Sequence, residues 1–549
     1  MINQIVPMLT MLLFDTSSSL HFYETMTTVN VGDCKRIVAE FRDADKAPLS
    51  FQFANTVYVS GAGIAVSTDS NCSSAVNSFV VAQGQSRFMF YIKTDQRNRL
   101  SLDVSAQGVQ TASLPVHSLD MMHYTGAAYY VATTGSDANS GSINAPFKTL
   151  LHALSQVTEG DAIFLREGQY TTTGNGPTIR HSDILIRSMP GETVKLIHQN
   201  TNLQYSNLWF FKDRGRVHGL EITGGFYGVK FDGADSVLSN SVIHHVDADG
   251  VKIVPEANDA VIWNNEIYRT RQNSSNGQGI DSVNADRLLI ENNYVHDIYN
   301  NEGVIADIAM KCKGGGTGCV FRHNRIENVG IGIAIGQSTD GQFFDSVSNP
   351  YNYESIDGLA YNNLIRNTRY AGIGFWSALN GRAYNNTLVD VARDGQAGIH
   401  LDKQNDYRNT PSTSKFNKNI RVKNNIVALH PDNTNSAVED IKVNSMPANN
   451  LSLISEYNLY FDPNRTAVFW DQTDYPNRNT RTYDVLGWMD LLGTTGSLEG
   501  NPDLNMSNDY RPNVNSPAID AGTRIEEFID DFSGNMRDPL KPDIGAHEN

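Results

Sequence analysis

Short apolar runs alternate with polar residues along most of the chain, and between about residues 217 and 430 the runs repeat. One unit sets a polar pair, usually Asn-Asn, between apolar residues, and its second asparagine recurs as Asn265, Asn293, Asn324, Asn363, Asn386 and Asn425. A second unit, Gly-apolar-x-apolar, begins at Gly228, Gly250, Gly279, Gly332, Gly372 and Gly398, and Asp307 is expected in the glycine's place in the remaining coil. The step from Gly228 to Gly250 is 22 residues, and coils of this kind are typical of solenoids. The pattern predicts a right-handed parallel β-helix with Asn and Gly at its corners and a hydrogen-bonded Asn ladder.

Other patterns precede and follow the repeats. The spacing of Phe147, Leu150, Leu151, Leu154 and Val157 predicts a short amphipathic helix, and a second helix is expected at 483–492. Residues 16–122 contain strand-like stretches at 86–93 and 100–105, the second with a period of two. We therefore predict an all-β chain: a small β-sandwich over 1–122, then a β-helix over 123–549 with an N-terminal capping helix and a C-terminal cap.

Strand alternation predicts which side chains of the Gly unit point outward. The first outward column is expected to read Lys230, Lys252, Asp281, Ala309, Ala334, Gly374 and His400. The second is expected to read Asp232, Val254, Val283, Lys311, Gly336, Trp376 and Asp402. Neighbouring coils lie about 4.8 Å apart, so Lys252, Asp281 and Lys311 are expected on three successive coils of one face.

Two insertions follow strands of this face, at 337–356 and 402–419, and the first is rich in aromatic residues such as Tyr351. A face walled by loops is a groove suited to a polymer. Tyr351, Trp376 and His400 are candidates for substrate binding, and the alternative for the aromatic rings is packing of the loops onto the barrel. Arg269 and Arg271 flank a loop leading to the groove, where they either hold a carboxylate or balance nearby acids.

Charge and cysteine content narrow the function. The 549 residues carry a net charge of −17, which argues against general nucleic-acid binding, and no apolar run is long enough to insert in a membrane. The apolar stretch at 5–14 is either a trimmed signal or a first strand. The four cysteines form two local pairs, which suits an oxidising compartment, although four buried thiols are the alternative. A secreted or cell-surface protein is expected.

Two resemblances add to this picture. The region around Cys34 and Cys72 resembles bacterial immunoglobulin-like modules, and that resemblance implies a Cys34–Cys72 disulfide. The opening at 129–170, the Asn-Asn coils and the tail motifs at 501–503, 509–511, 516–522 and 543–548 resemble bacterial right-handed β-helix proteins of the pectate-lyase-like superfamily. That superfamily includes lyases, hydrolases, epimerases and fibres without enzymatic activity, so the resemblance implies fold more than reaction.

Within that resemblance, 310–315 and 330–337 are similar to the Lys-Gly-Gly and Gly-Ile-x-Ile-Gly-Gln coils of lyase-like relatives. The literal match is Lys313, whereas the register favours Lys311. Alginate- and chondroitin-type lyases of this fold carry an Arg-His pair one coil later, where this chain has Ile335 and Gly336. The residue that protonates the leaving group therefore stays unassigned.

The chemistry of a lyase defines the candidate site. The enzyme must neutralise a uronate carboxylate, remove the adjacent carbon-bound proton and protonate the leaving oxygen. We assign catalytic roles to Lys311 as the base, with Lys252 and Lys313, and we expect Asp249, Asp281 and Asp307 to hold Ca²⁺. The structural alternative is a solvated charge ladder between coils.

Three functions stay open. The leading hypothesis is an exported lyase that cleaves an acidic, uronate-containing polysaccharide by β-elimination. A glycoside hydrolase is the second, because Asp247, Asp249 and Asp281 could supply its two carboxylates. The third is a glycan-binding adhesin or fibre without catalysis.

Overall fold

The structure is a computed structural model, and the chain divides into two compact units. The first comprises Met1–His123 with Ile525–Ile529, and the second comprises Tyr124–Arg524 with Asp530–Asn549. The structure describes residues 18–22, 26–43, 48–50, 54–96, 99–119, 121, 123–199, 205–272, 276–300, 302–344, 349, 352–403, 416–433, 436–441, 452–472, 481–525 and 527–549. The predicted boundary between residues 122 and 123 stays a prediction.

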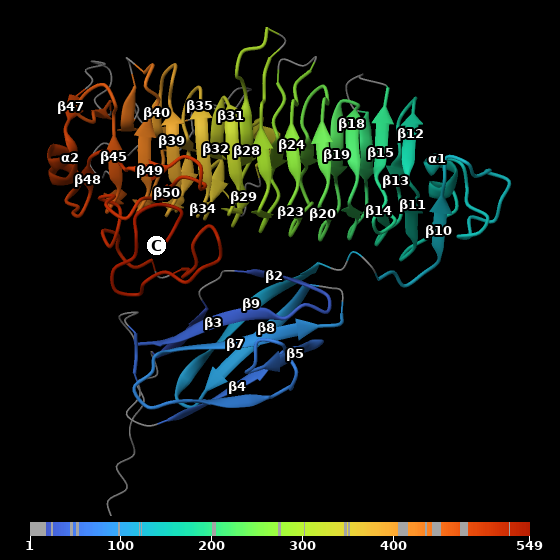
Figure 1. The fold of residues 1–549 in the computed structure, drawn as a ribbon, viewed down its shortest axis with the longest axis horizontal. Coiled ribbons are helices and arrows are strands. Elements are labelled where there is room, and N and C mark those ends of the chain that lie inside the picture. The colour runs from blue at the N-terminus through green and yellow to red at the C-terminus, as the bar shows by residue number, and fades with distance from the viewer. Residues whose placement is uncertain are drawn as a thin grey trace, which may run out of the picture. The chain divides into compact units, whose positions relative to one another are not determined.

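The second unit is built from three twelve-stranded sheets that run along a stack of coils (Figure 1). Sheet 1 contains β10 (Ala128–Val131), β11 (Ala162–Leu165), β14 (Leu185–Ser188), β17 (Arg216–His218), β20 (Val237–Ser239), β23 (Val261–Trp263), β26 (Leu289–Glu291), β30 (Val320–Arg322), β34 (Leu359–Tyr361), β38 (Arg382–Tyr384), β41 (Ile420–Lys423) and β44 (Leu453–Glu456). Sheet 2 contains β12 (Gly168–Thr172), β15 (Val194–His198), β18 (Glu221–Gly224), β21 (Val242–His244), β24 (Glu266–Tyr268), β27 (Tyr294–His296), β31 (Arg325–Val329), β35 (Leu364–Thr368), β39 (Thr387–Val391), β42 (Ile426–Leu429), β45 (Leu459–Phe461) and β48 (Leu498–Glu499). Sheet 3 contains β13 (Thr178–Ile179), β16 (Ser206–Phe210), β19 (Tyr227–Phe231), β22 (Val251–Ile253), β25 (Ile280–Val283), β28 (Ile308–Lys313), β32 (Ile331–Gly336), β36 (Ile373–Trp376), β40 (Ala397–Asp402), β43 (Ala437–Ile441), β46 (Phe469–Asp471) and β47 (Arg481–Tyr483).

The chain visits the three sheets in turn, and their strands pair in parallel, apart from the terminal pair β46 and β47. One continuous core of aliphatic and aromatic side chains fills the coils from Val131 to Trp488. This is a right-handed parallel β-helix, and the predicted all-β fold class is confirmed. Among the described residues, no helix is long and apolar enough to cross a membrane.

The turn from sheet 1 to sheet 2 contains the predicted asparagine ladder. The Nδ2 atom of each asparagine donates to Oδ1 of the next, at 3.0 Å from Asn265 to Asn293 and at 2.9 Å from Asn386 to Asn425. The ladder continues one coil beyond the prediction, because Asn425 donates to Asn458 at 3.0 Å. The residue before each ladder asparagine, such as Asn264 with φ 53°, takes the left-handed conformation that closes the corner. Each buried bond contributes about 1 kcal/mol, so the ladder stabilises the stacking of coils.

The predicted register of the Gly unit is wrong by two residues in one coil. Ile280 pairs with Met310, and Met310 pairs with Ile333, so Ala309 occupies the glycine's place and Asp307 does not. Space in this column is small, since a Cβ added to Gly279 would lie 2.6 Å from the carbonyl oxygen of Ala309. Asp307 instead takes the left-handed conformation, with φ 56°, at the turn that leads into β28.

Two helices lie at the ends of the β-helix (Figure 1). Helix α1 (Leu150–Leu154) begins after Thr149, whose side chain accepts a hydrogen bond from the His152 N–H. Helix α2 (Val485–Leu492) begins after Asp484 and ends at Gly493, which has φ 65°. Both predicted helices are therefore present, and α1 is shorter than the apolar spacing indicated. Further short elements are β29 (Gly316–Thr317), β33 (Ser355–Ile356), β37 (Ala378–Leu379), β49 (Leu504–Asn505), β50 (Arg511–Pro512) and the 3-10 helix η1 (Gly341–Phe343).

The first unit is a β-structure whose strands surround a separate hydrophobic core. Its strands are β1 (Ser19–Phe22), β2 (Thr27–Asn30), β3 (Lys35–Arg42), β4 (Asn55–Ser60), β5 (Ile64–Ser67), β6 (Ser78–Val81), β7 (Arg87–Thr94), β8 (Arg99–Ala106) and β9 (Val109–Leu119). Strand β9 connects two groups of strands, because it pairs with β1 and β2 along one edge and with β8 along the other. The likeness to immunoglobulin-like modules stays a prediction.

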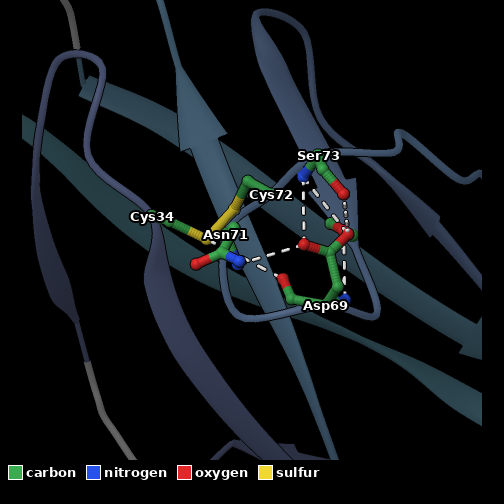
Figure 2. Close-up of a disulfide and its surroundings, with 6 residues drawn as sticks. Cys34, Asp69, Asn71, Cys72 and Ser73 are labelled. Carbon is green, nitrogen blue, oxygen red and sulfur yellow. Dashed lines mark hydrogen bonds between the residues drawn. A yellow bond between two sulfur atoms is a disulfide. The ribbon is translucent and has the colours of Figure 1, made fainter.

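Both cysteine pairs are disulfides. Cys34 and Cys72 are bonded, with their Cα atoms 5.7 Å apart. Figure 2 shows the Asp69 carboxylate beside this bond, where it accepts hydrogen bonds from the backbone N–H groups of Asn71 and Ser73. In the second unit, Cys312 is bonded to Cys319 and closes the glycine-rich loop after β28. Disulfides, which the cysteine pairing favoured over free thiols, are thus confirmed.

Candidate functional site

One outward column of sheet 3 gathers most of the predicted site residues. In register, it reads Lys230, Lys252, Asp281, Lys311, Ala334, Gly374, His400 and Asp440. Lys311 therefore stands in the first column, directly beside Asp281, and its predicted place beside Val283 is wrong. Lys313 pairs with Val283 in the second column. The cause is the two-residue shift of β28, which brings Lys252, Asp281 and Lys311 closer together than the sequence indicated.

Asp281 links the two lysines on either side of it. Lys252 Nζ contacts Asp281 Oδ2, and Lys311 Nζ lies 3.4 Å from Asp281 Oδ1. Lys252 Nζ also lies 3.5 Å from Asp249 Oδ2, and Asp249 Oδ1 accepts the Gln278 N–H at 2.9 Å. Asp249, Asp281 and the Lys311 side chain are each about 2% exposed or less. The cluster is thus a buried ionic network and not a solvated ladder.

The network moves the pKa of each member in a different direction. Burial alone would raise the pKa of Asp281, but Lys252 and Lys311 outweigh burial and hold it below its usual range. Burial lowers the pKa of Lys311 to about 8, because Asp281 compensates only in part. Burial raises the pKa of Asp249 to about 6, against the opposing charge of Lys252. Lys252 keeps its charge, since Asp281 and Asp249 raise its pKa above the usual value despite burial. Near neutral pH, Lys311 is therefore the cation of the network that releases its proton most easily.

The loop after β32 covers Lys311 and Lys313. Lys311 Nζ donates to Gln337 Oε1 at 3.4 Å, and Lys313 Nζ donates to the Ser338 carbonyl at 3.0 Å. Gln337 has φ 129°, a region that favours glycine. The loop is fastened by the buried Glu354, which accepts hydrogen bonds from the Thr339 N–H and hydroxyl and from the Gly314 N–H. Burial raises the pKa of Glu354 to about 7.

Asp307 and Arg271 form a separate pair at the edge of sheet 3. Arg271 Nη1 lies 2.8 Å from Asp307 Oδ2, and the same oxygen accepts the Gly277 N–H at 3.2 Å. Burial raises the pKa of Asp307, although Arg271 opposes this effect. The pair ties the turn before β25 to the start of β28.

The carboxylates predicted to bind Ca²⁺ are engaged by cationic side chains. Asp249 contacts Lys252, Asp281 contacts Lys252 and Lys311, and Asp307 contacts Arg271. Over the described ranges, no group of three or more His, Cys, Asp or Glu side chains is arranged to hold a metal ion. Ca²⁺ takes six to eight oxygen ligands, so the carboxylates in this arrangement do not fit it. Calcium stays a prediction.

The predicted substrate-binding residues Trp376 and His400 are buried. The Trp376 ring lies over Gly374, where an added Cβ would be 2.2 Å from the ring, and it packs with Ile308, Ile331 and Ala334. His400 Nδ1 lies 2.7 Å from Asp440 Oδ1, and its Nε2 lies 3.7 Å from Asp402 Oδ2. Burial alone would lower the pKa of His400, but Asp440 and Asp402 raise it to about 9. Trp376 is thus held by packing and His400 by its carboxylate partners. Tyr351 lies outside the described residues.

Three residues of this face were not identified from the sequence as parts of the site. Gln337 and Glu354 lie at the two ends of a recognised insertion, but nothing in the sequence shows that they face Lys311 and Gly314. Asp440 was missed because the repeats were identified only as far as residue 430, one coil too early. A search for the next strand of the Gly column would have found Asp440 opposite His400.

The fold and this column define a right-handed parallel β-helix with an ionic cluster on the outer face of one sheet. Residues 129–328 match the family model described as "Pel9A-like, right handed beta helix region". This part of the second unit is therefore similar to the right-handed β-helix region that the model describes.

Individual proteins give weaker matches. The chain is 27% identical over 173 residues to pectate lyase PEL9 of Emericella nidulans. This alignment covers 28% of this chain and 42% of that protein. It is 26% identical over 178 residues to pectate lyase L of Dickeya chrysanthemi, which covers 28% of this chain and 40% of that one. The chain thus matches about two fifths of the length of these relatives. Among solved structures, pectate lyase Pel9A aligns with a TM-score of 0.43 and 16% identity over 77% of this chain and 97% of that one.

Proposed function

We propose that this protein is an exported polysaccharide lyase that cleaves an acidic, uronate-containing polymer by β-elimination on the outer face of sheet 3. The observation that carries the proposal is the buried Lys311, whose ion-pair partner Asp281 also pairs with a second lysine, Lys252. A lysine whose pKa lies near 8 is an effective base at neutral to mildly alkaline pH. The matching relatives are pectate lyases, which act on this class of polymer by their names.

The reaction follows from the positions of the lysines. Lys311 Nζ, in its neutral form, takes the proton from the carbon next to the uronate carboxylate. The electron pair of that C–H bond forms a carbon–carbon double bond, the bond to the glycosidic oxygen breaks, and this oxygen leaves with a proton taken from solvent. Lys252, whose pKa is raised, stays positive, and Lys252 and Lys313 stabilise the charge that develops on the carboxylate. Because Lys311 is buried, the substrate reaches Nζ only after Gln337 moves away from it.

A panel of polymers tests the function. Purified protein is incubated with pectate, alginate, glucuronate polymers and neutral glycans, each with added Ca²⁺ and with a chelator. Ultraviolet absorbance from unsaturated ends is expected with at least one uronate polymer and with no neutral glycan. The chelator arm decides whether calcium is needed. Absence of absorbance with every uronate polymer in both arms would sink the lyase proposal.

A glycoside hydrolase is the second candidate, and one observation favours it. Asp249 has a pKa raised to about 6, whereas that of Asp281 is held low, and a protonated and an ionised carboxyl are the pair such enzymes use. Reducing ends that appear without ultraviolet absorbance would identify this reaction. Binding without cleavage would instead support a glycan-binding protein.

The two disulfides support export. Structural disulfides persist in oxidising compartments outside the cytosol, so a secreted or cell-surface location fits Cys34–Cys72 and Cys312–Cys319. Fractionation of the source cells, with the protein detected outside the cytoplasm and with both bonds intact, tests this location.

A further inference from the structure

A cavity lies between two successive turns that lead from sheet 2 to sheet 3. Its volume is about 500 Å³, and it is lined by Arg269, Gln272, Tyr299, Asn300 and Gly303. The first two residues follow β24, and the other three follow β27 on the next coil. A cavity of this size is within the range of small-molecule sites.

Arg269 supplies the charge of this cavity. Its side chain is exposed, and within the described part of the chain it forms no hydrogen bond or ion pair. Two residues further on, Arg271 is paired with Asp307. Both arginines have a left-handed backbone, with φ 48° and 67°, so the turn directs two neighbouring guanidinium groups to different places. An exposed, uncommitted guanidinium in a concave site binds a carboxylate with two parallel hydrogen bonds.

The other lining residues are held in place by their own contacts. The Tyr299 hydroxyl donates to Asp297 Oδ1 at 3.1 Å, which fixes the ring. Asn300 Oδ1 accepts the N–H groups of Glu302 and Val304 at 3.0 and 2.9 Å, so its Nδ2 is left as a donor. Asp297 is committed to His296 and Asn328 as well as to Tyr299. At Gly303, with φ 75°, an added Cβ would meet no atom within 4 Å, so the cavity is open at this edge.

From these contacts we infer that the cavity is a subsite for a carboxylate-bearing sugar unit of the polymer. Arg269 would hold the carboxylate, the amides of Gln272 and Asn300 would hydrogen-bond hydroxyl groups, and Tyr299 would contact the sugar ring. The cavity lies on the edge from which the chain enters sheet 3, because Asp307 and Arg271 link the same turns to β28. A polymer that runs from Lys311 across these turns would place a further unit in it. This inference rests on the proposed acidic substrate but not on the identity of the base.

Binding by calorimetry tests the subsite. The probes are hexasaccharides of galacturonate, mannuronate and glucuronate and their uncharged methyl esters, and the Lys311→Met background prevents consumption of the ligand. We expect the background protein to bind at least one acidic hexasaccharide and not its ester. Adding Arg269→Met is expected to weaken that binding about tenfold. The matched control is Arg421→Met, which changes an exposed arginine of sheet 1 and should leave binding unchanged.

A second variant guards against a folding defect. Gly303→Asn tolerates the left-handed backbone and places a side chain at the edge of the cavity without removing charge, so it too is expected to weaken binding. If Arg269→Met and Gly303→Asn bind as the background does, or if no acidic hexasaccharide binds, the subsite is refuted. The proposed function fails by a different result, namely the absence of unsaturated products from the wild-type protein.

Discussion

Two positions of one outward column shift the pKa of a buried cation in opposite directions. At Lys311, three lysines face Asp281 and Asp249, and the pKa of Lys311 falls to about 8. At His400, two carboxylates, Asp440 and Asp402, face one imidazole, and its pKa rises to about 9. Both side chains are almost completely buried. The ratio of carboxylates to cations around each group therefore decides whether the group loses its proton easily or keeps its positive charge.

The strongest test of this comparison removes the proposed base. Lys311→Met keeps the aliphatic length but not the amine, and we expect kcat to fall about 10²- to 10⁴-fold, the usual contribution of a general base. The rate of appearance of unsaturated ends on the active polymer measures it. Lys418→Met, at an exposed position of the described chain, is the matched control and should keep full activity. Full activity of Lys311→Met would show that another group removes the proton.

The charged state of His400 is tested by measuring the free energy of unfolding. The folded-state pKa of His400, about 9, lies above its ordinary value of 6.5, so the charged pair stabilises the fold fully below about pH 6.5 and loses this contribution as the pH rises through about 9. The shift corresponds to about 3 kcal/mol. Denaturant unfolding at several pH values is expected to show the decline in the wild type and a flatter profile in His400→Gln.

The control for that measurement is His181→Gln, an exposed histidine whose loss should not alter the pH profile. Equal slopes in the wild type and in His400→Gln would mean that the His400–Asp440 pair does not govern stability in this pH range.

Both sites depend on coils that keep their register, which the asparagine ladder enforces. Asn386 accepts from Asn363 and donates to Asn425 and to the Ala360 carbonyl, all within the core. Asn386→Ala leaves these partners unsatisfied, so we expect a loss of about 1–3 kcal/mol in the free energy of unfolding. The exposed Asn508→Ala should change stability by less than about 0.5 kcal/mol. Equal stability of the two variants would contradict a structural role for the ladder.

The smallest expected effect is a rise in the pKa of Lys311 when the neighbouring Lys252 is replaced. In Lys252→Met, Asp281 no longer shares its charge with a second lysine and pairs with Lys311 alone, so the pKa of Lys311 should rise. Because the neutral amine is the active form, the pH profile of kcat/KM should rise near pH 8 in the wild type and about one pH unit higher in the variant. A profile that stays in place, with Lys418→Met as reference, would show that Lys252 does not tune Lys311.

Much of the β-helix could be predicted because each repeated unit can be recognised within a few neighbouring residues. The Asn column was placed residue by residue, since each corner requires a left-handed residue followed by an asparagine. The predicted column of glycine positions is wrong in one coil, where Ala309 stands in place of glycine. Asp307 has a left-handed backbone at a different position, in the turn before the strand. Alternation within a strand gives a side chain's face, but only pairing with the neighbouring strands decides its register.

The solenoid and the face on which the lysines gather could be predicted from the sequence because the repeats and the alternation within strands are visible in short stretches of chain, and the grouping of the cysteines favoured disulfides. That the coil has three sides follows from the structure. Tertiary structure alone decided that Asp281 is shared between Lys252 and Lys311 and that Gln337 lies on Lys311. It also decided that Trp376 and His400 are buried and that Arg269 is left uncommitted beside a cavity. Burial and the distances between charges depend on how coils distant in sequence stack, and these quantities set the pKa values on which catalysis would depend.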